Sequence, residues 1–332
     1  MKQNKTMKRS VISCLIILAA MLTSCDVYDD LNPCPKGILL HFMYDYNMEY
    51  ADAFPQQVDC LTLYIYDEAG NYVETRTETG EILQDESYSM TIDLEEGSYR
   101  LVAYGGLECD EHTFSIDEEP AEGSLLTDLN VRMHHDNLTS NIRLHDLFYG
   151  AIDVKVEGEM YKDVTLPMMK NTNSIRVVLQ QADTEAEPLN IEDFDIRITD
   201  DNTLMGHDNA VISSGTVTYS PWTQGDGTVV GGSEEGTQVS VAQAEFSTSR
   251  LVTENEPYLT VYSKLRQETV VNIPLIRYLL LLKSERYAEM EDQEYLDRES
   301  DWSIIFLLND YTWHDVEIRI NDWTVRLNET SF

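Results

Sequence analysis

Apolar residues recur at every second position over much of this chain, and this alternation constrains the fold more than any other feature of the sequence. In the segment 61–66, Leu61, Leu63 and Ile65 share one face, and the residues between them share the other. This period is typical of a strand with one face against a core and differs from the helical period of 3.6 residues. A glycine-containing turn follows at 67–71, as expected of a hairpin. We therefore expect short antiparallel strands packed as a β-sandwich.

The same pattern continues to the carboxyl end. Further strands are expected at 72–73, 88–94, 99–104, 175–180, 194–198, 258–261, 269–273, 302–308 and 316–327. The alternation changes parity at Asn321 and Asp322, and a β-bulge within one continuous strand would explain the change. One helix is expected near 274–290, opened by Pro274 and buried against a sheet through its leucine-rich face. The sequence thus predicts an all-β protein with a minor helix.

The first 24 residues have the layout of a secretory signal. Four basic residues precede the apolar stretch 11–22, which is shorter than the about 20 residues that span a bilayer. The stretch ends in Leu22-Thr23-Ser24-Cys25, which reads as a lipobox with Cys25 as the acylated first residue of a bacterial lipoprotein. The alternatives are an uncleaved anchor, or an ordinary signal peptide with an incidental cysteine. Because no later segment reaches a membrane-spanning length, we expect the lipid to be the membrane attachment.

The mature chain is strongly acidic. Removing residues 1–24 takes away four of the 23 basic residues and none of the 60 acidic ones, which leaves 308 residues with a formal charge of −41. A surface of this charge repels nucleic acid and anionic lipid head groups, so we expect no nucleic-acid partner. Its length suggests about two domains.

Cysteine is sparse for an exported protein. Cys14 leaves with the signal and Cys25 carries the lipid, so Cys34, Cys60 and Cys109 remain. Three thiols allow one internal disulfide with one thiol left over. A Cys34–Cys60 or a Cys60–Cys109 pair satisfies this count, and the sequence leaves the choice open. The fold must be stabilised mainly by packing.

No catalytic or metal-binding motif stands out. The patterns Gly-x-Ser-x-Gly, His-Glu-x-x-His and Cys-x-x-Cys are absent. His134 and His135 are of metal-binding type, but adjacent residues of a strand point to opposite faces. The segments 67–71 and 199–202 carry oxygen ligands without a complete calcium loop, so we interpret them as turns first and weak calcium candidates second. We expect a non-enzymatic protein without metal or cofactor, and a long surface loop at 213–241, which is rich in Gly, Ser and Thr.

Several segments, in their order along the chain, resemble the FimB-like fimbrial anchor lipoproteins of Bacteroidales. They are 34–47, 53–58, 61–70, 96–106, 194–200, 294–298 and 313–326. The resemblance covers nearly the whole mature chain. It implies two transthyretin-like β-sandwich domains in tandem, which we place at 35–150 and 151–332 after the signal peptide 1–24 and a lipidated linker 25–34.

The resemblance also implies a role. Members of this family cap the base of a fimbrium, tie it to the outer membrane and influence its length. Shaft subunits of related fimbriae assemble by strand addition after an arginine-type protease removes an amino-terminal segment. The resemblance therefore implies fimbrillin-type shaft subunits as partners, held through β-strand contacts.

One feature of this sequence bears directly on that role. Between Cys25 and Arg76 the only basic residue is Lys36, so an early arginine cleavage site is missing. A subunit that keeps its first strand cannot offer the vacated groove to a neighbour, and it would terminate a polymer.

The acidic residues beside the lipid site have two interpretations. Asp26, Asp29 and Asp30 resemble the short acidic signal that exports Bacteroidales lipoproteins to the cell surface, or they are ordinary linker residues of an acidic protein. The leading hypothesis is thus a surface-exposed outer-membrane lipoprotein that anchors a fimbrium. The alternatives are a surface lipoprotein that binds glycan or a host protein through loops such as 213–241, and an exported hydrolase with an unrecognised site.

Overall fold

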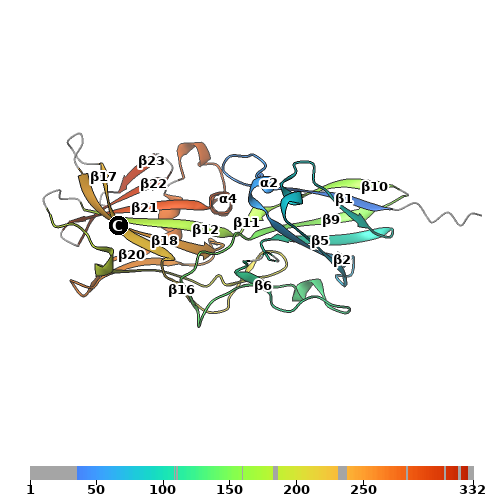
Figure 1. The fold of residues 1–332 in the computed structure, drawn as a ribbon, viewed down its shortest axis with the longest axis horizontal. Coiled ribbons are helices and arrows are strands. Elements are labelled where there is room, and N and C mark those ends of the chain that lie inside the picture. Colours follow the sequence, from blue (N-terminus) through green and yellow to red (C-terminus); the bar gives the residue numbers. More distant parts are fainter. Residues whose placement is uncertain are drawn as a thin grey trace, which may run out of the picture.

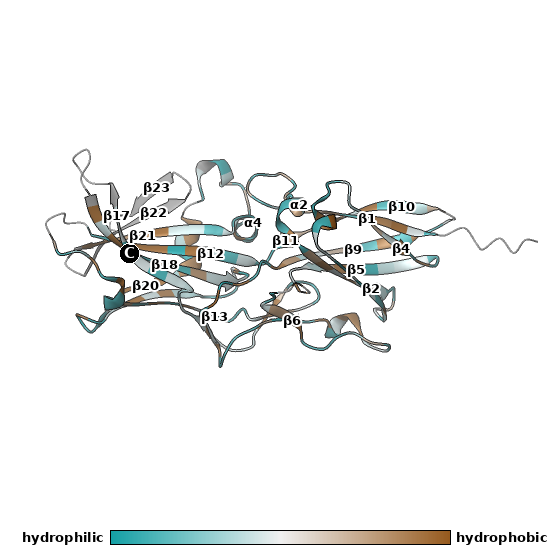
Figure 2. Ribbon diagram, in the orientation of Figure 1, coloured by the Kyte–Doolittle hydropathy of each residue, from teal (hydrophilic) through white to brown (hydrophobic). Residues whose placement is uncertain are grey.

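The structure is a computed structural model that describes residues 36–107, 109, 111–158, 160–181, 186–230, 238–281, 283–309, 312–320 and 323–327. Cys25, Cys34 and the three aspartates of the expected export signal lie outside these residues. The described chain is an elongated β-protein in which two lobes follow one another along the long axis (Figure 1). Apolar residues gather on the strands, and polar residues gather on the connections between them (Figure 2).

The first lobe contains two sheets. One has the strand order β10-β1-β4 and the other the order β11-β9-β5-β2-β3. Their strands are β1 (Gly37–Met43), β2 (Cys60–Asp67), β3 (Tyr72–Thr79), β4 (Met90–Asp93), β5 (Gly97–Gly105), β9 (Phe148–Val156), β10 (Tyr161–Pro167) and β11 (Met169–Lys170).

The second lobe also contains two sheets. Their orders are β17-β18-β12-β21-β22-β23 and β20-β19-β13-β16-β8. The strands are β8 (Thr139–Ser140), β12 (Thr172–Gln181), β13 (Phe194–Asp200), β16 (Val217–Tyr219), β17 (Thr223–Val230), β18 (Gln238–Ser249), β19 (Tyr258–Ser263), β20 (Glu268–Pro274), β21 (Asp301–Asn309), β22 (Thr312–Ile320) and β23 (Trp323–Leu327).

A small third element, the middle sheet, joins segments from both halves of the sequence. Its order is β15-β14-β7-β6, from β6 (Phe114–Ile116), β7 (Val131–Met133), β14 (Leu204–Met205) and β15 (Val211–Ile212). The helical segments are short: α2 (Phe54–Gln57), α3 (Leu275–Leu280), α4 (Asp292–Arg298) and the 3₁₀ turns Glu81–Gln84, Leu126–Asp128, Ile191–Asp193 and Glu285–Tyr287. The prediction of an all-β chain with few helices is confirmed.

Both faces of strand β2 are buried, and this explains how the lobes are connected. Leu61, Leu63 and Ile65 belong to a core between the two sheets of the first lobe. On the opposite face, Tyr64 and Tyr66 belong to a second core, which continues through the middle sheet into the second lobe. Because apolar packing is continuous along the molecule, the lobes are held together by a shared core in addition to their chain connection.

Three details differ from the sequence-based expectations. The expected helix at 274–290 is a shorter helix, α3, which ends at Leu280, with α4 following from Asp292. The expected loop at 213–241 is largely strand, since β16, β17 and part of β18 lie within it; the glycines of β17 occupy an edge strand that pairs with β18. Asn321 and Asp322, where the bulge was expected, lie outside the described residues; the strands on either side of them pair antiparallel, with Ile320 of β22 opposite Trp323 of β23. Paired positions of an antiparallel ladder share a face, so a hairpin accounts for the change of parity.

The domain boundary expected between residues 150 and 151 falls inside β9. This strand pairs with β5, and β10 pairs with β1, so both belong to the first lobe. The sequence shows no break at this point because one continuous strand crosses it. The division into two independently folding domains stays a prediction.

Candidate functional site

Strand β1 is the first strand of the described chain and the central strand of its three-stranded sheet. It pairs in parallel with β10, from Gly37 opposite Tyr161 onward. On its other side it pairs antiparallel with β4, with Gly37 opposite Asp93. Neither edge of β1 is open to a further strand over this paired region. The strand lies toward the end of the long axis that is opposite to β17 and β20 (Figure 1).

The sequence of β1 explains its position. Ile38 and Leu40 are fully buried and Phe42 is nearly so, while the residues between them are less buried, as alternation requires. Burial of three such side chains stabilises the strand by roughly 5–9 kcal/mol, at about 1.5–3 kcal/mol each. Gly37 is required at the start, because a Cβ atom there would lie 1.9 Å from the carbonyl oxygen of Ile92. Strand β1 is thus an integral part of the first-lobe core.

An arginine on α4 fastens the second lobe to the first. The guanidinium carbon of Arg298 lies 4.0 Å from the ring centre of Tyr46 and 4.7 Å from that of Tyr50. Its Nε donates to Glu294 at 2.7 Å, and Nη1 donates to the carbonyl oxygen of Asn47 at 3.4 Å. A cation held between two aromatic rings is attracted by both ring faces. The loop that follows β1 is therefore clamped to α4.

A buried ion pair holds α4 in place. Arg250 donates through Nε and Nη2 to the two carboxylate oxygens of Asp297 at 2.9 and 2.8 Å. The side chains are only 14% and 7% exposed. Gln293 donates to the same carboxylate, and Arg250 also donates to the carbonyl oxygen of Asn209. This bidentate pair connects the end of β18 with α4 and the loop that contains Asn209.

The structure joins Cys60 to Cys109 by a disulfide, with 5.4 Å between their Cα atoms. His145 lies beside this bond: its Nε2 is 3.1 Å from Cys109 Sγ and 3.3 Å from Asp59 Oδ1. Both neighbours face the same imidazole nitrogen. A nucleophile–histidine–carboxylate triad needs the two partners on different nitrogens, and the sulfur is already oxidised. The arrangement therefore does not form a catalytic triad.

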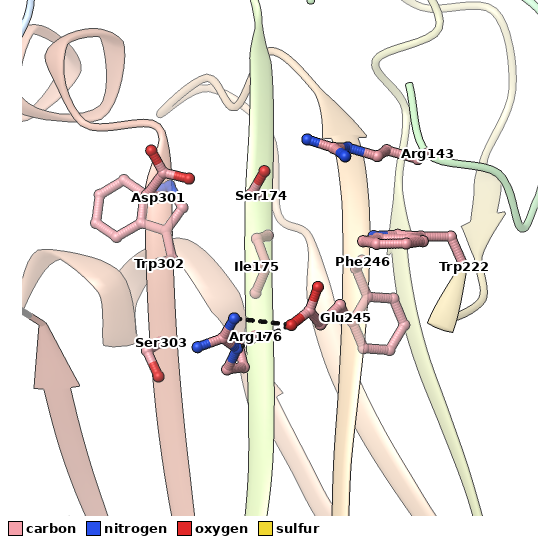
Figure 3. Close-up of a pocket in the computed structure, with 10 residues that line it drawn as sticks. All are labelled: Arg143, Ser174, Ile175, Arg176, Trp222, Glu245, Phe246, Asp301, Trp302 and Ser303. Carbon is pink, nitrogen blue, oxygen red and sulfur yellow. Dashed lines mark hydrogen bonds and ion pairs between the residues drawn. The ribbon is translucent and has the colours of Figure 1, made fainter. Parts of the chain in front are cut away.

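A polar depression lies on the solvent face of the sheet that contains β12, β18 and β21 (Figure 3). The guanidinium carbon of Arg143 lies over the Trp222 ring at 5.5 Å from its centre. Arg176 and Glu245 form an ion pair at 2.8 Å on the floor of the depression. An aromatic ring bordered by charged groups and the hydroxyls of Ser174 and Ser303 can bind a polar ligand with apolar faces.

The two weak calcium candidates are turns stabilised by their own hydrogen bonds. Asp67 accepts from the backbone of Ala69 and from both the backbone and the side chain of Asn71. These hydrogen bonds lower the pKa of Asp67. Asp201 accepts from the backbone of Ser214 at 2.8 Å. Both carboxylates are thus used by the loops that contain them.

Asp200 behaves differently from its neighbour Asp201. It is 4% exposed, and burial raises its pKa to about 6. Its Oδ1 accepts from the backbone of Asp201 and from Asn255, whereas Oδ2 has no hydrogen-bond partner among the described residues.

The histidines at 134 and 135 do not converge. His134 Nε2 lies 3.0 Å from Ser115 Oγ, and its ring stacks edge-on to His112. His135 Nδ1 instead accepts from the backbone of Leu138. Burial, together with the nearby His112, lowers the pKa of His134. The two side chains have separate local partners, and both residues lie in the connection that follows β7.

Sequence reasoning missed two polar contacts between distant segments, that of His145 with Asp59 and that of Arg298 with the loop after β1. Asp59 and His145 are 86 positions apart, and Arg298 is 251 positions from Asn47. No local motif signals either contact, because each depends on the packing of distant segments. Among the residues that the structure describes, no helix is long and apolar enough to cross a membrane.

Solved structures with this architecture include bacterial proteins described as a candidate adhesin and as a candidate polysaccharide-binding protein. A candidate adhesin from Bacteroides thetaiotaomicron is 50% identical, with a TM-score of 0.83, and the match covers 90% of this chain and 100% of that one. A candidate polysaccharide-binding protein from the same organism is 31% identical, with a TM-score of 0.76 over 88% of this chain and 98% of that one. The fold thus defines a class of two-lobed, adhesin-like β-proteins.

Within this class, the sequence model described as "Fimbrillin-A associated anchor proteins Mfa1 and Mfa2" matches residues 31–329, and the chain belongs to this family. The minor fimbrium anchoring subunit Mfa2 of Porphyromonas gingivalis is 24% identical over 340 residues, which cover 99% of this chain and 98% of that protein. The solved structure of the fimbrial anchor protein Mfa2 from that organism shares the fold, with a TM-score of 0.66 at 20% identity over 88% of this chain and 99% of that one. The predicted resemblance to fimbrial anchor proteins is confirmed.

Proposed function

We propose that this protein anchors a fimbrium to the outer membrane through a lipid on Cys25 and terminates the polymer at its base. Membership of the anchor family supports a role as a fimbrial accessory subunit. Its relative in P. gingivalis is named for anchoring a minor fimbrium. The role is non-enzymatic, and the partners are fimbrillin-type shaft subunits that contact the protein through β-strands.

The position of β1 carries the proposal of termination. Strand addition needs a groove from which a strand has been removed. Here β1 fills the middle of its sheet, and its apolar side chains are buried in the core. The first arginine after Cys25 is Arg76, which lies within β3. A chain that keeps β1 has no such groove to offer to a further subunit.

The path of mechanical load supports the anchoring role. Gly37, the first residue of β1, lies twelve residues after Cys25. A pull on the lipid would act along β1, so its hydrogen bonds to β4 and β10 would be loaded in shear and would have to break together. The continuous core and the Arg298 clamp then carry the load into the second lobe.

A cysteine exchange tests the lipid attachment. Cys25→Ala should leave the fold unchanged but release fimbriae into the medium, because the acyl group is the link to the membrane. Cys14→Ala is the matched control, since Cys14 lies in the removed leader, and it should keep fimbriae on the cells. Retention of fimbriae by the Cys25→Ala strain would contradict the anchor proposal.

A pair of substitutions in the exposed turn after β1 tests strand retention. Glu49→Arg places an arginine-type cleavage site in the loop that follows β1, six residues after Met43, whereas Glu49→Lys adds the same charge without that site. We expect processing and loss of cell-bound fimbriae for Glu49→Arg, and normal fimbriae for Glu49→Lys. A processed Glu49→Arg chain that still anchors fimbriae would show that a retained β1 is not needed.

The acidic residues beside the lipid are proposed to direct surface export. Replacing Asp26, Asp29 and Asp30 by alanine should protect the protein from protease added to intact cells, because it would stay on the inner face of the membrane. Equal accessibility before and after the replacement would assign these residues to an ordinary linker.

A second candidate function, glycan binding, rests on the depression beside Trp222. Indole rings stack on sugar faces, and the Arg176–Glu245 pair offers polar partners. The relative described as a candidate polysaccharide-binding protein favours the same function. Saturable binding of glycan by purified protein that is lost in Trp222→Ala and kept in Tyr262→Ala, an exposed tyrosine on the other sheet, would support it.

A further inference from the structure

We propose that Asp59, Cys60, Cys109 and His145 form a tetrahedral Zn²⁺ site once the Cys60–Cys109 disulfide is reduced. Each of the four side chains offers one metal-ligating atom, and these four atoms all lie within 4.8 Å of one another. They come from three separate segments: the start of β2, the loop after β5 and the loop before β9. The proposal is independent of the anchoring role.

The spacing of three of the ligand atoms fits a zinc tetrahedron. Cys109 Sγ, His145 Nε2 and Asp59 Oδ1 are separated by 3.1, 3.2 and 3.3 Å. Zinc binds nitrogen, oxygen and sulfur ligands at about 2.0–2.3 Å, which corresponds to tetrahedral edges of about 3.3–3.8 Å. The three atoms therefore need to move apart by only a few tenths of an ångström. Cys60 Sγ, now bonded to Cys109, supplies the fourth corner after reduction.

The electrostatics of this four-residue cluster in its disulfide form also favour binding of a cation. A disulfide sulfur has no proton to donate, so Asp59 Oδ1 and Cys109 Sγ face each other as two acceptors at 3.2 Å. Both face His145 Nε2, which can donate only one proton. Lone pairs that converge on one point from several acceptors are the arrangement that a metal ion satisfies.

The chemistry balances with a dithiol or phosphine as the reductant. A dithiol transfers two electrons and two protons to the Cys60–Cys109 bond and becomes a disulfide itself. A phosphine attacks one sulfur and breaks the same bond; water then supplies the two thiol protons, and its oxygen leaves on the phosphorus as the phosphine oxide. Zinc then displaces the two thiol protons and binds the two thiolates with the neutral imidazole and the carboxylate. Cys60 lies on the buried side of the cluster. The exposed Asp59 carboxylate lies on its solvent side, in a depression that Thr79 and Glu111 also line. The cluster would thus be cross-linked by the disulfide in the oxidised protein and by zinc in the reduced protein.

Cobalt is the probe for this site. The full chain is reduced with a phosphine, the reductant is removed, and Co²⁺ is added. We expect one equivalent of Co²⁺ to give the intense visible bands of a tetrahedral thiolate complex, Zn²⁺ to displace it, and the oxidised protein to give no such bands. Far-ultraviolet circular dichroism should show the same β-sheet signal before and after reduction.

Two histidine variants keep the disulfide, and therefore the fold of the starting material. Loss of even an outer-shell partner typically weakens metal binding by about 10–100-fold, so His145→Ala should weaken it by at least about tenfold. His41→Ala, at an imidazole in β1 outside the cluster, should bind as the unmodified chain does. The proposal is overturned if the reduced chain gives no tetrahedral cobalt spectrum, if His145→Ala and His41→Ala bind equally, or if reduction destroys the β-sheet signal and zinc does not restore it.

Discussion

Removing the carboxylate of Asp297 should strongly destabilise the second lobe. Asp297→Ala leaves the guanidinium of Arg250 buried and without its bidentate partner, since the two side chains are only 7% and 14% exposed. Breaking one side of a buried ion pair costs about 3–5 kcal/mol. The exposed pair Arg176–Glu245, with side chains 56% and 26% exposed, is the matched control. Glu245→Ala removes the same charge and should cost less than about 1 kcal/mol.

Urea unfolding followed by tryptophan fluorescence measures this difference, because all four tryptophans of the chain, Trp222, Trp302, Trp313 and Trp323, lie after residue 172. Trp302 is buried in the second lobe, donates to Asn173 and contacts Tyr295 of α4, so its emission reports on the region around α4. A cycle with Arg250→Met and Asp297→Leu should give a coupling free energy of at least about 3 kcal/mol, because removing both charges leaves neither one unpaired. Equal losses of stability for Asp297→Ala and Glu245→Ala, or a coupling free energy near zero, would show that the buried Arg250–Asp297 pair does not stabilise the second lobe.

Two further predictions concern pH and backbone geometry. Burial raises the pKa of Asp200 from 3.8 to about 6. Between these two pH values the folded state keeps a proton that the unfolded chain releases. The free energy of unfolding should therefore fall by about 3 kcal/mol as the pH rises from the lower value to the higher one. Urea midpoints between pH 4 and 8 should show this fall relative to Asp200→Asn, and parallel profiles would contradict it. Gly37→Ala should destabilise the protein by about 1–3 kcal/mol, because its Cβ atom would overlap the carbonyl oxygen of Ile92. Gly225→Ala, which meets no neighbour, should change the thermal midpoint much less, and a reversed order would argue against a tightly seated β1.

Local pattern predicted the fold class well. The alternation of Leu61, Leu63 and Ile65 placed β2 correctly and identified the face that packs on the first-lobe core. The strand expected at 302–308 is β21 (Asp301–Asn309), and it lies between β12 and β22. Such predictions succeed because a strand of this kind records the burial of each face in its own sequence.

The connections were harder to predict than the strands. The glycine-rich segment that includes β17 has little apolar character, and it is ordered by pairing with β18. The change of parity at 321–322 fits a bulge or a hairpin equally well from sequence, and only the pairing of β22 with β23 decides between them. The sequence limits the disulfide to one pair but cannot say which distant thiol packs beside Cys60.

The described polar sites depend on contacts that no local pattern encodes. Arg298 meets Tyr46 and Tyr50 from α4, the helix that the Arg250–Asp297 pair connects to the end of β18. His145 reaches Asp59 only because the loops after β5 and before β9 meet at the start of β2. The resemblance to fimbrial anchors supplied the role, and the structure supplies the contacts by which the chain would bear load.

Mass spectrometry of the mature protein from outer membranes tests the lipid attachment and the retention of β1 in one measurement. We expect an amino-terminal peptide that begins at an acylated Cys25 and continues without a break through β1. A mature chain that begins at residue 77 or later would contradict it, because such a chain would have lost both the lipid and the strand that closes the first lobe.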